Sequence, residues 1–171
     1  VREDGLPIAL LGVVGVFLTF FLLHEGIEST SASTAAVIFS MNPVFTVLVA
    51  SLILRERLGL AGWLGVGLGL LGAFIAVTGF RFSGLFSRED FLGGILVLVS
   101  AVTWSLYTVY GKRYSERHGS LVLSFLTMVS GSLLLGILLA VQGGWGELAG
   151  YNVRAWTWLL YLGLVTVGIG Y

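Results

Sequence analysis

The sequence contains no cysteine, only two histidines, and charged residues at only 11% of its 171 positions. Without cysteine the chain has no disulfide, no thiolate metal site and no cysteine nucleophile. His24 and His118 are too few and too widely separated to indicate a metal site by themselves. Nine Lys and Arg balance nine Asp and Glu, so the composition indicates no nucleic-acid partner.

Apolar residues take the place of the missing charges. Hydrophobic residues make up 57% of the chain and the mean hydropathy is +0.99, whereas about a quarter of residues are charged in soluble domains. Six apolar runs follow one another with short connections: Leu6–Ile27, Thr34–Leu54, Ala61–Phe80, Phe91–Tyr110, Leu121–Gln142 and Trp156–Tyr171. Backbone amides in hydrocarbon must be satisfied within the segment, which requires helices. The sequence therefore predicts an all-α, polytopic transmembrane helical bundle of about six spans.

The distribution of basic residues predicts the orientation of these spans. Counting on alternate sides of the membrane places six basic residues on one side and three on the other. The six are Arg2, Arg55, Arg57, Lys112, Arg113 and Arg117, and the three are Arg81, Arg88 and Arg154. By the positive-inside rule the first group is cytoplasmic in a multi-pass protein of the plasma membrane, with the lipid bilayer as its surroundings.

Two features predict a repeat that extends beyond this sequence. The run ALLGVVGVFLTF (9–20) aligns with LYLGLVTVGIGY (160–171), and the two enter the membrane from opposite faces, as in an inverted-topology repeat. The last apolar run has 16 residues, fewer than the ~20 that a span needs. Since the sequence also begins with Val1, we expect it to be an internal fragment.

Three segments carry a resemblance to a known family. The segment TSASTAAVIFSMNPVFTVLVASLILRERL (30–58) has a small-residue helix entry and a mid-helix Asn-Pro, and the glycine-spaced GWLGVGLGLLGAFIAV (62–77) follows it. The third segment, GGILVLVSAVTWSLYTVYGKR (93–113), places a tryptophan before a basic helix end. Together they resemble the EamA-like branch of the drug/metabolite transporters.

The resemblance implies a ten-helix transporter built from two inverted five-helix repeats. Residues 1–80 would then be the last three helices of the first repeat, and residues 81–171 the first three of the second. It further implies secondary transport or export of a small metabolite or drug by alternating access, without a cofactor. The partner expected from it is a small-molecule solute.

One face of the fourth predicted span combines aromatic and hydroxyl side chains. Ser100, Thr103, Trp104 and Tyr107 recur at offsets of three and four, which places them together on an α-helix. Such a face is expected to point into the bundle, where the aromatic rings would stack on a solute and the hydroxyls would bond it. The alternative is that Ser and Thr bond neighbouring backbone or helices, as is common in membranes.

The second predicted span contains a proline at its middle. Pro43 removes an amide donor and predicts a kink, with Asn42 beside it and Ser40 just before. These three residues are expected to line the substrate cavity and give the helix a hinge. The alternative is a packing kink whose Asn bonds a neighbouring helix.

An acidic and histidine-containing cluster lies at the outer end of the first span. His24 and Glu28 are i,i+4 neighbours and Glu25 lies between them. If they turn inward they are the candidates for proton coupling, because a histidine changes charge near neutral pH. The alternative is a solvated helix end at the membrane surface.

Two other functions compete with transport. A membrane-embedded enzyme acting on a lipid would need a catalytic cluster, for which only His24, Glu25 and Glu28 are available, so no catalytic residue is assigned. A non-transporting helical module is the third possibility. A homodimer could complete a pathway, although six spans do not resemble the four-helix small multidrug transporters that pair in this way.

Overall fold

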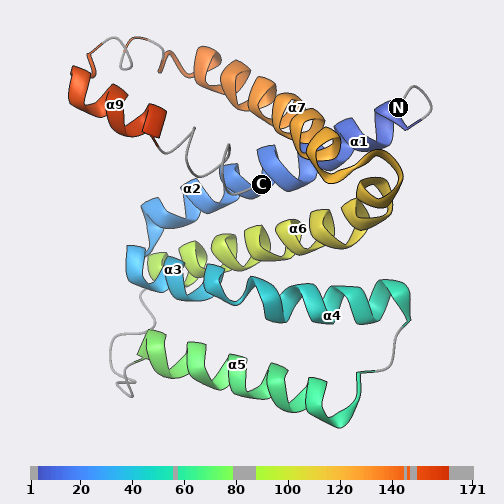
Figure 1. Ribbon diagram of the computed structural model, residues 1–171. Helices are drawn as coiled ribbons and strands as arrows, with labels where there is room; N and C mark the ends of the chain where they lie inside the picture. The colour runs from blue at the N-terminus through green and yellow to red at the C-terminus, as the bar shows by residue number, and fades with distance from the viewer. Residues whose placement is uncertain (1–3, 56–57, 79–87, 145, 147–149, 162–171) are drawn as a thin grey trace. The chain divides into compact units, whose positions relative to one another are not determined.

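The computed structural model describes residues 4–55, 58–78, 88–144, 146 and 150–161. All regular structure within these ranges is helical (Figure 1). The helices are α1 (Gly5–Gly12), η1 (Val13–Leu18), α2 (Thr19–Ser29), α3 (Ala32–Ser40), α4 (Asn42–Leu54), α5 (Leu60–Thr78), α6 (Arg88–His118), α7 (Ser120–Val141) and α9 (Val153–Tyr161). This confirms the predicted all-α class.

The chain divides into two compact units, residues 1–132 and 133–171. The first contains α1 to α6 and the beginning of α7, and it carries all the candidate residues named above. In its described part the second unit contains the end of α7 and α9, where Trp158 and Tyr161 meet edge to face with ring centroids 5.8 Å apart.

Length and hydropathy confirm that the chain crosses a membrane several times. Four helical stretches are long and apolar enough to span: Gly5–Ser29, Thr34–Leu54, Phe91–His118 and Ser120–Val141. The third predicted run corresponds to α5, of which Leu60–Gly72 is a shorter apolar helix. The sixth predicted run begins within α9, and its residues 162–171 lie outside the described residues. They include most of the second of the two runs aligned as an inverted repeat.

The first span is a continuous helix with a π-helical centre. The backbone passes from α1 through η1 to α2, and the π turns occupy Val13–Leu18. Directly after them the hydroxyl of Thr19 donates to the carbonyl of Val14, five residues back, at 3.1 Å. A π-bulge widens the helix locally and is common at functional sites. The apolar pattern of this span gave no indication of it.

The second span is broken where the proline was expected to kink it. Ser31 caps α3 by accepting the amide of Thr34 at 3.0 Å, and α3 ends at Ser40. Met41 has φ −78° and ψ 2°, outside the helical range, and its N–H donates to Ile38 at 3.1 Å. Pro43 then occupies the first turn of α4, where its missing donor costs no helical bond.

The fourth span is longer than predicted. The apolar run ends at Tyr110, but α6 continues to His118 and has 31 residues. The end of an apolar run marks the edge of the hydrocarbon, whereas Lys, Arg and Glu remain good helix formers beyond it. The helix stops where Gly119 adopts φ +88°, the left-handed conformation that favours glycine after a helix end.

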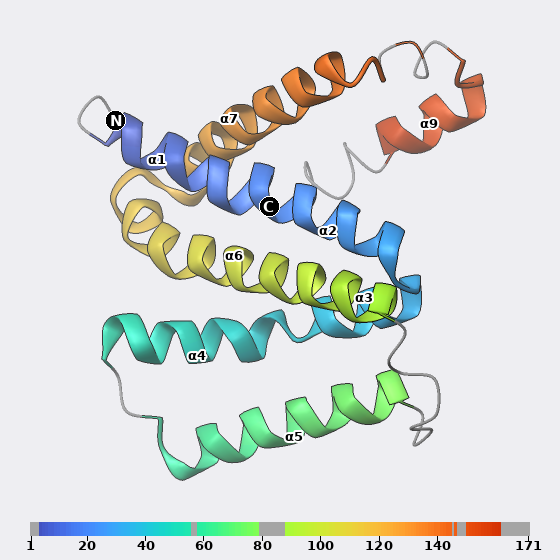
Figure 2. The same cartoon turned by 180° about the vertical axis from the view of Figure 1, so that it is seen from behind.

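Helix α6 is the centre of the first unit. It packs against η1 and α2 on one side and against α3 and α4 on the other, and α5 lies beyond α3 and α4 (Figure 1, Figure 2). Hydroxyl side chains are buried at these contacts, while leucines on the outer faces are exposed. The fully buried hydroxyls include Thr19, Ser100, Ser105 and Thr127. Small polar residues inside and leucines outside are the arrangement expected in lipid, where apolar surfaces need no burial.

Candidate functional site

An aromatic cluster lies where α2 meets α6. The half-buried Trp104 meets Phe20 edge to face at 6.4 Å and Tyr107 at a tilted 5.4 Å, both measured between ring centroids. Phe20 comes from α2 and remains 45% exposed. The three rings therefore form a partly open surface, the kind on which a planar or apolar group can stack. We call Phe20, Trp104 and Tyr107 the aromatic cluster.

Tyr107 is seated directly on the π-helical segment. Its side chain packs against Gly15, whose lack of a side chain makes room for the ring. At its other end the phenol oxygen lies 3.3 Å from the hydroxyl of Thr127 on α7. The tyrosine thus connects η1, α6 and α7, and a change at any of the three would move its ring.

The hydroxyls on this face of α6 are bonded within the protein. Ser100 donates to the carbonyl of Val97 at 2.6 Å, and Thr103 is 2.7 Å from the hydroxyl of Thr19 on α2. Thr103 also donates to the carbonyl of Ser100 at 2.7 Å. All of these hydroxyls are buried. Their partners are the backbone of α6 itself and, for Thr103, the hydroxyl of Thr19 on α2, so the open part of the face is aromatic.

Asn42 lies on a different side of α6. One turn along α4, Thr46 donates to Ser105 of α6 at 3.2 Å, and residues four apart share a helix face. The side-chain oxygen of Asn42 is buried and accepts no hydrogen bond from the described residues. A buried amide oxygen without a donor is costly in a membrane interior. This atom is therefore ready to accept a hydrogen bond from a solute, a water or another helix.

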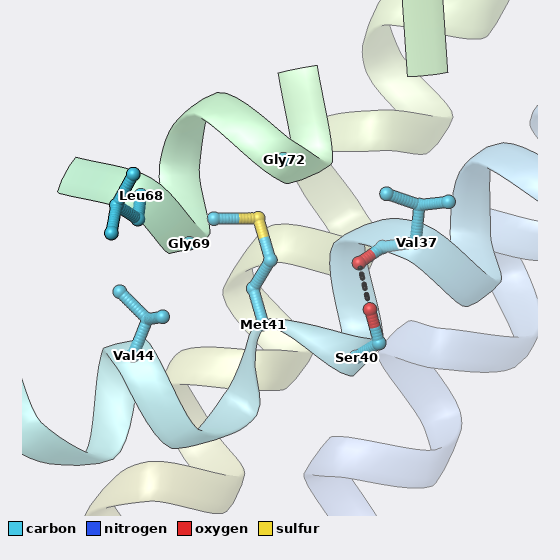
Figure 3. A pocket seen from close by; sticks show the side chains of 7 residues that line it. All are labelled: Val37, Ser40, Met41, Val44, Leu68, Gly69 and Gly72. Atoms are coloured by element: carbon cyan, nitrogen blue, oxygen red, sulfur yellow. Dashed lines mark hydrogen bonds between the residues drawn. The ribbon is translucent and has the colours of Figure 1, made fainter. Parts of the chain in front are cut away.

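A small cavity of about 280 Å³ lies beside the break between α3 and α4. Figure 3 shows Met41 and Val44 facing Leu68 and the glycines of α5 across it, with the hydroxyl of Ser40 donating to Val37 at 2.7 Å. Ser40 therefore lines this cavity, and its contact with a solute stays a prediction. Asn42 and Pro43 do not line this one.

The predicted residues do not form one group. Trp104, Tyr107 and Thr103 lie together against η1 and α2, whereas Asn42 faces the opposite side of α6 and Ser40 faces α5. Sequence reasoning missed the groups that complete the first site, namely Gly15, Thr19, Phe20 and Thr127. The glycine and the threonine at i,i+4 in an apolar span were a usable signal, since small and hydroxyl residues mark helix contacts.

The expected proton-coupling cluster lies at an exposed helix end. His24 Nε2 is 3.4 Å from Glu28 Oε1, and their side chains are 72% and 64% exposed. Glu25 on the same turn is half-buried. This exposure favours the solvated helix end over an inward-facing proton site. Within the described residues no group of three or more His, Asp or Glu is placed to hold a metal.

A second ionic cluster joins the two helix ends on the predicted cytoplasmic side. Asp4 Oδ2, just before α1, is 2.8 Å from His118 Nε2 and 3.0 Å from an Arg117 Nη1 at the end of α6. The hydrogen bonds from His118 and then Arg117 lower the pKa of Asp4 below its ordinary value of 3.8. The cluster links the start of the first span to the end of the fourth.

Asp4→Asn is expected to lower the melting temperature slightly at neutral pH. It is expected to have no effect once the pH is below the lowered pKa of Asp4. Because the folded pKa of Asp4 is depressed, its contribution is present above 3.8 and disappears as the pH falls through the lowered value. The effect is small because exposed ion pairs are screened. Thermal unfolding of both forms at pH 7 and at pH 3 or lower measures it, and a difference that grows on acidification would contradict it.

The comparisons with known proteins agree with this architecture. The model of the EamA-like transporter family matches residues 2–78 and 91–171. The chain is 33% identical to an uncharacterized transporter of Clostridium kluyveri over 96% of its length and 53% of the relative. It is 30% identical to the uncharacterized transporter YdfC of Bacillus subtilis, with 99% and 53% covered.

A third relative has a more specific name. A probable terminal-alkyne amino-acid exporter of Streptantibioticus cattleyicolor is 32% identical, with 99% of this chain and 55% of the relative covered. The chain thus spans about half the length of the curated relatives it matches. No solved structure matches it.

Proposed function

Because this chain belongs to the EamA-like transporter family, we propose that it moves a small organic solute across the cell membrane by alternating access. Its several apolar helices make it a multi-pass membrane protein. The proposal concerns the full-length transporter, since the chain covers only about half of its relatives.

The aromatic cluster is the observation that carries the assignment of the solute path. Trp104 is half-buried on the central helix, and one of its partners, Phe20, is 45% exposed. Aromatic surface that is partly open within a bundle provides stacking area for a solute. The π-helical turns under Tyr107 support the same location, because such irregularities are frequent at functional sites.

A separate contact, which we propose for another state of the cycle and not together with the aromatic cluster, is the side-chain oxygen of Asn42. Its buried position without a donor among the described residues supports a hydrogen bond to the solute in one state of the cycle. The broken helix beside it supports a hinge, since Met41 and Pro43 already interrupt the regular bonding there.

Amino acids are the first solute class to test. The cluster offers rings and one phenol, which suit an amphipathic solute with an apolar part. A relative named as an exporter of a terminal-alkyne amino acid supports an amino-acid solute and outward transport. Family membership favours transport over catalysis on a lipid, and the exposure of His24 and Glu28 supports that preference.

The domain boundary proposed from the sequence also gains support. The family model matches in two stretches, and the gap between residues 78 and 91 contains the boundary at residue 80. We propose that residues 1–80 and 81–171 belong to two successive repeats of opposite orientation. In such transporters solute sites lie near the bilayer midplane between the repeats.

Trp104→Ala is expected to reduce solute flux about tenfold in proteoliposomes of the full-length protein. This is the effect of losing about 1.4 kcal/mol of binding, a modest share for an aromatic anchor. The assay measures uptake and efflux of amino acids, sugars and cationic drugs, with and without a proton gradient.

The matched control is Trp63→Ala, which removes the same side chain from a 57% exposed position on α5. It is expected to leave the flux unchanged. Equal flux in the wild type and in Trp104→Ala would move the solute path away from the cluster. Absence of any flux, together with turnover of a lipid that Glu25→Gln abolishes, would replace transport by the enzyme interpretation.

A further inference from the structure

An apolar groove runs between the first and fourth spans, outside the aromatic cluster. It encloses about 320 Å³. Its walls include Pro7, Leu10 and Val14 from the first span and Leu106, Tyr110 and Tyr114 from α6. Except for the two phenols these side chains are aliphatic, so the groove accepts a hydrocarbon and offers little to a polar solute.

Basic residues at the C-terminal end of α6 lie on the same helix face as the wall of the groove. Arg113 and Arg117 follow Tyr110 by three and seven residues, which places them on the same helix face as the wall. Lys112 and Glu116 project about 160° and 120° away at ~100° per residue, on the far side of the helix. The groove face therefore carries only positive charge on this stretch of α6.

Asp4 and His118 border the same end. Asp4 accepts from one Nη of Arg117 at 3.0 Å and contacts His118 at 2.8 Å. The side chain of Arg117 is still 53% exposed, and a guanidinium has five N–H donors in all. Arg113 is exposed as well. Among the described residues, two arginines thus outweigh one carboxylate at the mouth of the groove.

The arginines and the aliphatic wall lie at the membrane depths expected for the headgroup and the acyl chain of a lipid. The basic residues lie on the side that the positive-inside count assigns to the cytoplasm. Tyrosines are favoured at the membrane interface, directly below the headgroups. An acyl chain would lie along the aliphatic part, and a phosphate would lie at the arginines. Basic pockets between helices on the cytoplasmic side are known to bind anionic headgroups.

We propose that this groove between α1 and α6 is a binding site for an anionic phospholipid of the inner leaflet. One acyl chain occupies the groove, and the headgroup phosphate bonds Arg113 and Arg117. The site is separate from the aromatic cluster and does not depend on the transported solute.

The test measures lipid binding to the full-length protein in detergent by native mass spectrometry. The probes are phosphatidylglycerol and phosphatidylcholine with identical acyl chains. The wild type is expected to bind phosphatidylglycerol more tightly, and Arg113→Gln to reduce that preference about tenfold. Lys112→Gln removes the same charge from the opposite helix face and is expected to retain the preference.

A melting measurement on Arg113→Gln and one further variant, Leu10→Trp, test the site independently of any effect of the charge change on the fold. Arg113→Gln preserves the Asp4–Arg117 pair, and its melting temperature is expected to equal that of the wild type. Leu10→Trp fills the groove and is expected to weaken both lipids equally. Equal phosphatidylglycerol binding by wild type and Arg113→Gln, or unchanged binding by a folded Leu10→Trp, would overturn the site and leave the groove to another helix of the transporter.

Discussion

Gly131→Leu is expected to prevent α7 from packing on the first span and to abolish stable folding. A Cβ at Gly131 would lie 2.7 Å from the backbone oxygen of Gly12 and would overlap Val16. Gly12 is equally restricted, because its own Cβ would lie 2.5 Å from the carbonyl oxygen of Thr127. The two backbones touch, so no side-chain rotation makes room for a leucine.

The loss is expected to exceed the ~1–3 kcal/mol typical of overpacking, because backbone must move rather than side chains. Gly136→Leu, on the same helix, is the matched control, since a Cβ there meets no described atom within 4 Å. Thermal unfolding and size-exclusion chromatography in detergent compare the two variants. A Gly131→Leu protein that elutes and melts like the wild type would show that the α1–α7 contact is absent.

Gly15→Ala is expected to destabilise the protein by about 1–3 kcal/mol and, under the proposed function, to reduce solute flux through the full-length transporter. The added methyl would lie 2.5 Å from Tyr107 Cβ and would overlap two ring atoms. The ring would have to leave η1 and with it the hydroxyl of Thr127. Since Tyr107 belongs to the aromatic cluster, the flux is expected to fall together with the melting temperature.

A double-mutant cycle separates this contact from a general effect of alanine in the π-helix. Tyr107→Ala removes the ring that the methyl meets, so Gly15→Ala is expected to cost much less in that background. Residues in contact show coupling of about 0.5–3 kcal/mol. Gly5→Ala on α1, where a Cβ meets no described atom, serves as the control. Additive effects of the two substitutions would contradict the contact.

Individual elements show why part of the fold could be predicted. The apolar runs predicted α7 almost to the residue, because hydrocarbon allows only a structure that satisfies its own backbone. The predicted fourth span ends at Tyr110, eight residues before α6 ends at His118. Hydropathy indicates where the hydrocarbon ends, and a helix can continue beyond that point. The π turns were missed because a bulge depends on how one side of a helix is packed.

The candidate site could be predicted only along one helix. Helical spacing placed Thr103, Trp104 and Tyr107 on one face, and they lie there. It could not show that Thr103 is bonded by Thr19, or that Asn42 belongs to the opposite side of α6. Those facts depend on how each helix is rotated about its axis against its neighbours.

The sequence by itself determined that this chain is a helical membrane protein of the EamA-like family. Its shortage of charge and its long apolar runs indicate a lipid environment, and in lipid such runs form helices because each segment must satisfy its own backbone. The tertiary structure decided which polar groups are already bonded and which surfaces stay open, including the aromatic cluster and the α1–α6 groove. The reason is physical, because helices in lipid associate through close contacts of small and hydroxyl groups, and a contact exists only between two surfaces.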